Sequence, residues 1–261
     1  LQPVSGYTIS TSVKKDVITP VLRKYSVMSI IPEFVDPEYT FLSFNTRVKF
    51  NISKSTSSQS TMEYAVKSEV ANYINSISKF NADYLESTLL TNIVNADSGI
   101  VSADITKKLG FKVSPIFGKE TTFSKYTNNA IVPGSISSTL FNILHDGEYT
   151  TVSINEVPGK SLSVKTVSGG IEVIDTLGLY TKTGELLKEI GTVNLVTGKF
   201  DLTFSIASYL TGSRFVLISF ETVSPDIITN RNQILAIDTI VADIAIGRLE
   251  NNVVTTEIYA K

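Results

Sequence analysis

The stretch Val27–Asn51, VMSIIPEFVDPEYTFLSFNTRVKFN, carries the clearest strand signal in the chain. Between positions 42 and 52 the even positions are apolar except for one threonine, and the odd positions are polar or charged. Alternate side chains of a strand point to opposite faces, so this pattern predicts one buried face and one wet face. Two prolines before it disfavour a helix. The strand should therefore begin near Glu38 or Tyr39.

Two helices are predicted after this strand. Ser60 and Glu63 have the spacing of a capping box, which satisfies two free N–H groups at a helix start, and Asp83 and Glu86 repeat it. Apolar residues then recur at steps of three and four, the spacing of one helix face. These residues are Met62, Val66, Val70, Tyr73, Ile74 and Ile77 in the first helix, and Leu85, Leu89, Leu90, Ile93 and Val94 in the second.

From Ile100 the alternation returns, so the first part of the chain reads strand, helix, helix, strand. We expect the two helices to cover one face of a small antiparallel sheet. The predicted core of this unit consists of Val66, Val70, Ile74 and Leu89 from the helices and Phe44, Val48 and Phe50 from the strand.

The pattern of the sequence changes after the stretch Ser114–Gly134, which contains two prolines and two glycines. The second half shows short β-like runs in place of helical periodicity. Seven short β-like runs lie between positions 136 and 222, separated by dipeptides that end in glycine, such as Asp146-Gly147 and Thr197-Gly198. Such dipeptides supply the positive φ of tight turns. Short strands at this spacing are typical of a sandwich or a partly closed barrel. Beyond Pro225, further β-like pieces either complete a sheet or reach a neighbouring subunit.

The predicted fold class is therefore α+β, a small strand-helix-helix-strand domain followed by a β-rich sandwich or partly closed barrel domain. Valines at positions 13, 17 and 21 predict a short helix near the start, interrupted by Pro20. The expected division is 1–30 as an N-terminal segment with this helix, 31–118 as the α+β domain, 119–226 as the β-rich domain and 227–261 as a C-terminal β-rich tail.

Composition argues against several classes of partner. The 261 residues include 23 lysines and arginines against 25 aspartates and glutamates, a formal charge of −2 without a basic run, so nucleic acid is not expected as a partner. No apolar run approaches the roughly 20 residues of a membrane span, so no membrane partner is expected. Cysteine is absent, which excludes disulfides and thiolate metal sites and suits a reducing cytoplasm. The chain starts with Leu1, which suggests a fragment or a processed product.

The residues that could carry chemistry form no recognisable site. His145 is the only histidine, so a site with two or three histidine ligands cannot be built, and a G-x-S-x-G elbow for a serine triad is absent. We interpret His145 as a turn residue and Gly169-Gly170 as a hairpin turn. A catalytic pair of carboxylates across a cleft remains an open possibility, although the sequence points to no particular pair. We predict no catalytic, cofactor-binding or metal residues, no cofactor, and no enzyme.

Two aromatic residues occupy the otherwise polar face of the first strand. Tyr39 and Phe41 stand at odd positions, where solvent-facing residues are predicted. Exposed aromatics are favoured at protein interfaces. A contact with the preceding segment or with the second domain explains them equally well.

The wording PEFVDPEYTFLSFNTRVKFN (Pro32–Asn51) resembles the baseplate wedge proteins of contractile-tailed bacteriophages, of the T-even type and the wider baseplate J-like family. A second phrase, IGTVNLVTGKFDLTF (Ile190–Phe204), is similar to the family's strand, Thr-Gly turn, strand element. The resemblance implies the C-terminal portion of a wedge protein, a structural virion protein without an active site.

The same resemblance implies a place and partners. The protein would sit in the tail baseplate of the virion after assembly in the host cytoplasm. It would form homodimer contacts that join wedges into the ring beneath the tail sheath, and its partners would be a second copy, other wedge subunits and the sheath-initiator protein.

An alternative function is an extracellular ligand-binding β module of the adhesin type, suggested by the turn-rich and threonine-rich second half. The helical first unit argues against it. The quaternary state discriminates the two, because an assembly module should bury a large contact between copies and an adhesin should not.

Overall fold

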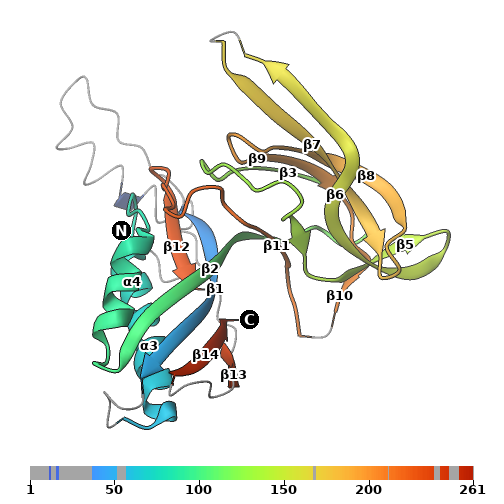
Figure 1. Cartoon of the computed structure of the whole chain (residues 1–261). Helices are drawn as coiled ribbons and strands as arrows, with labels where there is room; N and C mark the ends of the chain where they lie inside the picture. Colours follow the sequence, from blue (N-terminus) through green and yellow to red (C-terminus); the bar gives the residue numbers. More distant parts are fainter. Residues whose placement is uncertain are drawn as a thin grey trace.

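The computed structural model in Figure 1 describes most of the chain from residue 37 onward. For Phe50, Gln59 and two C-terminal strands it describes the backbone only. Of the predicted N-terminal helix only residues 16–17 are described, and the proline-containing segment before position 37 lies outside the description. The described residues are 12, 16–17, 37–51, 57–166, 169–210, 212–237, 242–246 and 253–260.

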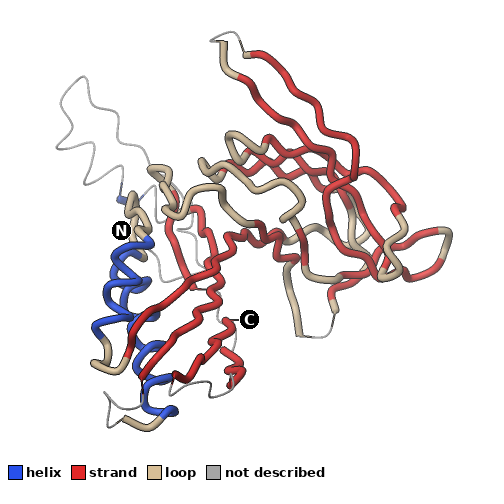
Figure 2. Tube along the Cα trace, viewed as in Figure 1, coloured by secondary structure: helices blue, strands red, loops and turns tan. Residues whose placement is uncertain are grey.

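The first part of the chain contains four elements in the predicted order. They are strand β1 (Glu38–Asn51), helix α3 (Gln59–Ile77), helix α4 (Glu86–Asn95) and strand β2 (Ile100–Val113). The strand starts at Glu38, as predicted from the two prolines before it. Strands β1 and β2 pair in antiparallel fashion with Thr46 opposite Ile105, and both helices lie on one side of them (Figure 2).

The even positions of β1 form the buried face. Leu42, Phe44, Thr46 and Val48 are all buried, whereas the odd positions are half-buried or exposed. The helices contribute the other half of this core with Met62, Val66, Tyr73, Ile74, Leu89 and Ile93. The predicted core is confirmed for its members with described side chains, except that Val70 is only partly buried at the margin.

Both helix starts differ from the capping boxes read in the sequence. Helix α3 begins after Ser58, whose Oγ accepts a hydrogen bond from the Thr61 N–H at 3.2 Å. Helix α4 begins after Leu85, which offers no side-chain cap, and Asp83 forms other contacts. The cap of α4 must therefore come from residues outside the local sequence.

Strand β2 belongs to both halves of the molecule. Its first part pairs with β1, and its last residues pair with β11 (Val216–Phe220). Phe111 of this last part is buried and stacks edge-on against Phe200 at 4.9 Å between ring centroids. A Cβ on Gly110 would lie only 2.9 Å from the Ile218 carbonyl oxygen, so glycine lets the strands approach closely at the crossover.

The second half is β-structure with short turns. Its strands, besides β11, are β3 (Thr121–Tyr126), β4 (Ser137–Ser138), β5 (Phe141–His145), β6 (Glu148–Lys165), β7 (Ile171–Thr181), β8 (Leu186–Asn194), β9 (Lys199–Phe204) and β10 (Ser208–Tyr209). From β2 the neighbours run β11, β4, β6, β7, β8, β9 and β3, while β10 pairs with β5. Gly198 has φ +68°, and a side chain there would meet Thr127 and Asn129, so the Thr-Gly turn before β9 requires glycine.

The chain then returns to the first sheet. Strand β12 (Gln233–Ile237) pairs in parallel with the start of β1, and strand β14 (Val253–Ala260) pairs antiparallel with its end. Strand β13 (Ala242–Ile246) adds to the outer side of β14. The C-terminal strands therefore lie beside the first strand of the description (Figure 1).

The predicted fold class is wrong. Among the described residues, strands account for 53% and helices for 16%, so the described part of the chain is mostly β. Within the described residues the strands join a single 14-stranded mixed sheet, not a small α+β sheet followed by a separate sandwich. The reason is that β2 continues past the helix-covered region into the second half, so that its pairings with β1 and β11 link both halves through hydrogen bonds.

Truncation of Phe44 tests the face of β1. Its side chain is 3% exposed and packs 5.7 Å from Tyr84 between ring centroids, so Phe44→Ala should lower the free energy of unfolding by about 3–5 kcal/mol in urea titrations. Ser43→Ala, one position along on the other face, should change it by less than about 0.5 kcal/mol. Similar costs for both variants would contradict the assignment of the faces.

Candidate functional site

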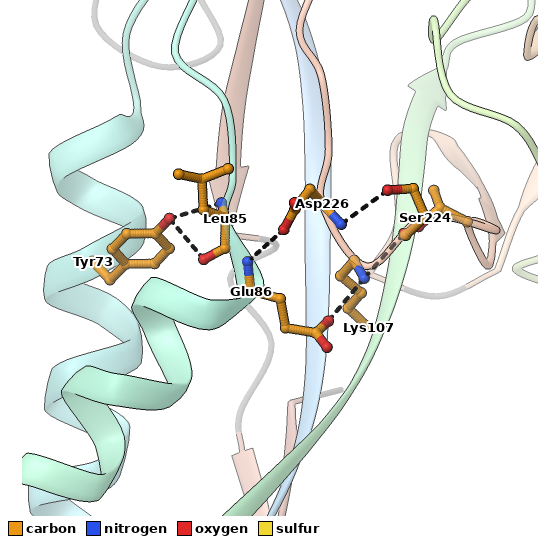
Figure 3. A network of polar contacts seen from close by, with 7 residues as sticks. Tyr73, Leu85, Glu86, Lys107, Ser224 and Asp226 are labelled. Atoms are coloured by element: carbon orange, nitrogen blue, oxygen red, sulfur yellow. Dashed lines mark hydrogen bonds and ion pairs between the residues drawn. The ribbon is translucent and has the colours of Figure 1, made fainter.

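The best-defined polar site surrounds the segment that leads from β11 back to β12. We call residues 222–233 the return segment. It runs beside the start of α4 and beside β2, and Figure 3 shows the polar contacts that it makes there. Ile227 pairs with Tyr84 through two backbone hydrogen bonds of 2.9 and 3.0 Å, which fixes the position of the segment against the helical unit.

Asp226 supplies the missing cap of α4. Its Oδ1 accepts a hydrogen bond from the Glu86 N–H at 3.0 Å, although the two residues are 140 positions apart. The N–H of Asp226 itself donates to the Ser224 hydroxyl at 3.1 Å, which orients the carboxylate. A carboxylate at a helix N-terminus satisfies a free N–H and favours the helix dipole. The start of α4 therefore depends on the return segment.

A buried ion pair lies next to this cap. The Lys107 ammonium of β2 lies 3.0 Å from the Glu86 carboxylate, and their side chains are 7% and 22% exposed. The same ammonium lies 3.5 Å from the Ser224 carbonyl oxygen and 5.7 Å from the centre of the Tyr84 ring. The lysine thus contacts the helix, the return segment and an aromatic face at once, which compensates for its removal from water.

Two tyrosines complete the cluster. The Tyr73 hydroxyl accepts from the Leu85 N–H at 2.9 Å and donates to the Leu85 carbonyl at 3.1 Å, so α3 holds the turn before α4 (Figure 3). Tyr84 is fully buried, and its hydroxyl has no hydrogen-bond partner among the described residues. Burial raises the pKa of both phenols, and for Tyr84 the nearby Glu86 carboxylate adds to the increase in pKa. Both stay protonated at neutral pH, so neither serves as an anionic base.

The rest of the return segment is held by polar side chains, of which Asn129, Thr229 and Gln233 are buried and Asp83 is exposed. Asp83 Oδ1 accepts from both the N–H and the hydroxyl of Thr229, at 2.7 and 3.1 Å. Asn129 accepts from the Ile228 N–H and donates to the Ile228 carbonyl. Gln233 donates to the Thr40 hydroxyl of β1. The segment is thus attached to α4, to the second half and to β1, and we call this set of contacts the polar clamp.

A second polar feature pairs two acids of the β-rich half. Glu156 of β6 and Asp175 of β7 are close enough to influence each other, and Asp175 is buried with one carboxyl oxygen unpaired among the residues described. Glu156 also accepts from the N–H groups of Gly134 and Ile136, at 2.6 and 3.1 Å. Burial is the main cause that raises the pKa of Glu156. Carboxyls in direct contact lack the gap of at least about 5 Å that glycoside hydrolysis needs.

The residues singled out in the sequence fall in separate places. His145 is the last residue of strand β5, next to the β5–β6 turn and not in it as predicted. It lies 3.6 Å from the Asp146 carboxylate, and its side chain is 43% exposed. Asp146 has φ +51° and the following glycine φ +85°, a pair that fits a tight hairpin turn. On β1, Phe41 is covered by the Lys112 ammonium, 3.9 Å from its ring centre, which also lies 4.3 Å from Phe215. Lys112 belongs to the end of β2, so Phe41 and Phe215 of the second half contact the same lysine. A direct contact of Phe41 with the second half stays a prediction.

The described residues were also compared with the requirements of a metal site and of a membrane-spanning helix. Within the described ranges, no group of three or more histidine, cysteine, aspartate or glutamate residues is arranged to hold a metal ion. None of the helices in those ranges is long and apolar enough to cross a membrane.

Two comparisons relate the chain to known proteins. Residues 38–110 match the family model described as baseplate structural protein gp6, C-terminal domain III. The chain is also 25% identical over 142 residues to baseplate wedge protein gp6 of Enterobacteria phage T4. The alignment covers 54% of this chain and 21% of that protein, so this chain spans only a minor part of its relative's length.

The predicted resemblance to baseplate wedge proteins is confirmed. The matched residues begin at the first residue of β1 and end within β2. They therefore include the helix-covered unit with Tyr73, Glu86 and Lys107. The gp6-like region carries one side of the polar clamp, and the return segment, from outside that region, supplies the other.

The ion pair can be tested with a double-mutant cycle. Glu86→Leu leaves the Lys107 ammonium buried without its partner and should lower the free energy of unfolding by about 3 kcal/mol. The double variant Glu86→Leu, Lys107→Met replaces both charges with apolar groups and should lie within about 1 kcal/mol of the native chain. Urea titrations of the native chain, both single variants and the double variant measure these values. Additive losses would contradict a direct pairing.

The acid pair predicts a pH effect. The pKa of Glu156 is raised by folding, so the folded chain binds this proton more tightly than the unfolded chain. Its contribution to stability is present at low pH and is lost as the pH rises through the pKa of the folded state, which lies above the ordinary 4.5. Glu156→Gln should therefore become more stable relative to the native chain between pH 4.5 and neutrality in urea titrations. The opposite trend would mean that folding lowers the pKa of Glu156.

Proposed function

We propose that this chain is a structural part of a phage tail baseplate, in the manner of a wedge protein, and that it acts through protein contacts without catalysing a reaction. The observation that carries the proposal is the match of residues 38–110 to gp6 C-terminal domain III, which spans β1, both helices and most of β2. The polar clusters support it, because each of them joins parts of the chain and none presents an activated nucleophile or base.

Two connections join the helix-covered unit to the β-rich half, which suits a protein that transmits force within an assembly. Strand β2 runs without interruption from the helix-covered unit into the β-rich half, so force along it passes through hydrogen-bonded backbone. The return segment ties the same two regions a second time through side chains that are mostly buried. Two independent connections resist bending better than a single linker does.

The finer assignments are also proposals. We infer a virion location in the tail baseplate, assembly in the host cytoplasm, and contacts with a second copy, other wedge subunits and the sheath-initiator protein that join wedges into the ring. They are supported by the resemblance and by exposed strand edges in the β-rich half, which can pair with a neighbouring chain.

Labelling of intact tails tests the proposal. Antibodies raised against the purified chain should bind the baseplate end of virions that contain it, visible as gold particles beneath the sheath. Antibodies against the major sheath protein serve as the control for accessible antigen along the tail. Label confined to host-binding fibres would support the adhesin alternative, and label absent from particles would contradict a structural role.

A further inference from the structure

The β6–β7 hairpin extends away from the rest of the β-rich half (Figure 1). We call residues 158–166 and 169–174 the arm. Every residue of β6 from position 158 to its end is exposed. The arm nevertheless carries apolar side chains, with Leu162 62%, Ile171 60% and Val164 37% exposed. Exposed apolar side chains on a projecting hairpin mark a contact surface.

The arm also offers an unpaired strand edge. Within the described chain, the β6 residues beyond position 156 pair only with β7, because β5 meets β6 at 148–152 and β4 meets it at Asn155. The Thr166 N–H donates to the Gly170 carbonyl at 2.9 Å, so Thr166 and Gly170 form a hydrogen-bonded pair. Hydrogen-bonded and non-hydrogen-bonded pairs alternate along antiparallel strands. The N–H and C=O groups of Ser161, Ser163 and Lys165 therefore point away from β7.

We propose that this edge pairs with the same edge of a second copy, antiparallel and centred on Ser163. The inference rests on the proposed function, because a baseplate brings more than one copy together. A two-fold axis through Ser163 places Ser161 opposite the partner's Lys165, so all outward backbone groups of these residues find partners, about six hydrogen bonds in total.

The side chains fit this register. Leu162 comes to lie directly opposite the partner's Val164, and within each arm Ile174 lies opposite Leu162 and Glu172 opposite Val164. Each row across the two copies therefore brings three apolar side chains together and ends in a glutamate. No like charges meet, because Lys165 faces a serine. Lys165 also comes within two strands, about 10 Å between Cα atoms, of the partner's Asp175, whose carboxylate has an unpaired oxygen among the described residues.

The rival edge fits a second copy less well. Strand β3 ends the sheet in the β-rich half, and two of its three exposed side chains, Thr122 and Ser124, are polar. Tyr126, 44% exposed, is its one exposed aromatic residue. One end is already in use, because Lys125 pairs with Glu38 at 3.4 Å and the Tyr126 carbonyl accepts from Asn230. Ionic and polar cover of this kind protects an edge from pairing.

The native chain contains no cysteine, so thiols can be placed one at a time to read the register. We would make Leu162→Cys and Val164→Cys separately, mix them under mild oxidation with copper–phenanthroline, and identify the crosslinked dimers by intact mass. In the proposed pairing, position 162 of one copy lies about 4.5 Å from position 164 of the other copy between Cα atoms. Two copies of the same variant hold their thiol-bearing Cα atoms about 8 Å apart, beyond the reach of a disulfide.

The expected result is that the mixture forms mainly mixed dimers, well above the statistical proportion, and that each variant alone crosslinks slowly. Ser124→Cys on β3 serves as a matched exposed thiol and should also crosslink slowly. Dimers in statistical proportion, or faster crosslinking of Ser124→Cys, would overturn the inference.

This outcome is separable from that of the proposed function. If the chain does not crosslink but antibodies locate it in the baseplate, the arm pairing is contradicted and the proposed function stands. Specific crosslinking in a chain absent from particles removes only the baseplate role.

Discussion

The continuity of strand β2 is the constraint on which the rest of the structure depends. One strand serves as partner of β1 at its beginning and of β11 at its end. Its first part must present Ile105, Lys107 and Leu109 to the helices, and its last part must present Phe111 and Val113 to the core of the β-rich half. Because side chains alternate along a strand, a shift of one residue would reverse both faces at the same time. The two halves therefore cannot choose their registers independently.

The polar clamp adds specificity to that register. Apolar burial alone does not distinguish closely related positions of the return segment, whereas Asp226 and Asp83 each accept hydrogen bonds from one particular N–H group. Buried ion pairs such as Lys107 with Glu86 contribute little net stability, because desolvation offsets attraction, but an incorrect position leaves a buried charge unpaired. We infer that the clamp selects one arrangement of the two halves. A part that transmits force within an assembly needs such a single arrangement.

The sequence was informative where the signal is local. The prolines before β1 predicted its start near Glu38, and its alternation predicted its buried face. The three- and four-residue spacing predicted the apolar faces of both helices, because all these patterns repeat within a few residues. The start of α4 was misread because Asp83 has the form of a cap but bonds Thr229, while the real cap, Asp226, lies 140 residues away. The partnership of Lys107 with Glu86 was missed because Lys107 looks like an ordinary surface charge and Glu86 was assigned to a capping box. The fold class failed for a similar reason, since no local pattern shows that β2 continues into a second pairing.

Our central claim is that the two halves form one cooperative unit, and hydrogen exchange measured by mass spectrometry across a urea series tests it most directly. Peptides from α3 and α4 report on the first half, and peptides from β7 to β9 report on the second. A shared strand and the clamp predict that both sets lose protection at the same urea concentration, because neither half unfolds without the other. Loss of protection in one set at clearly lower urea, with the other still protected, would contradict the claim.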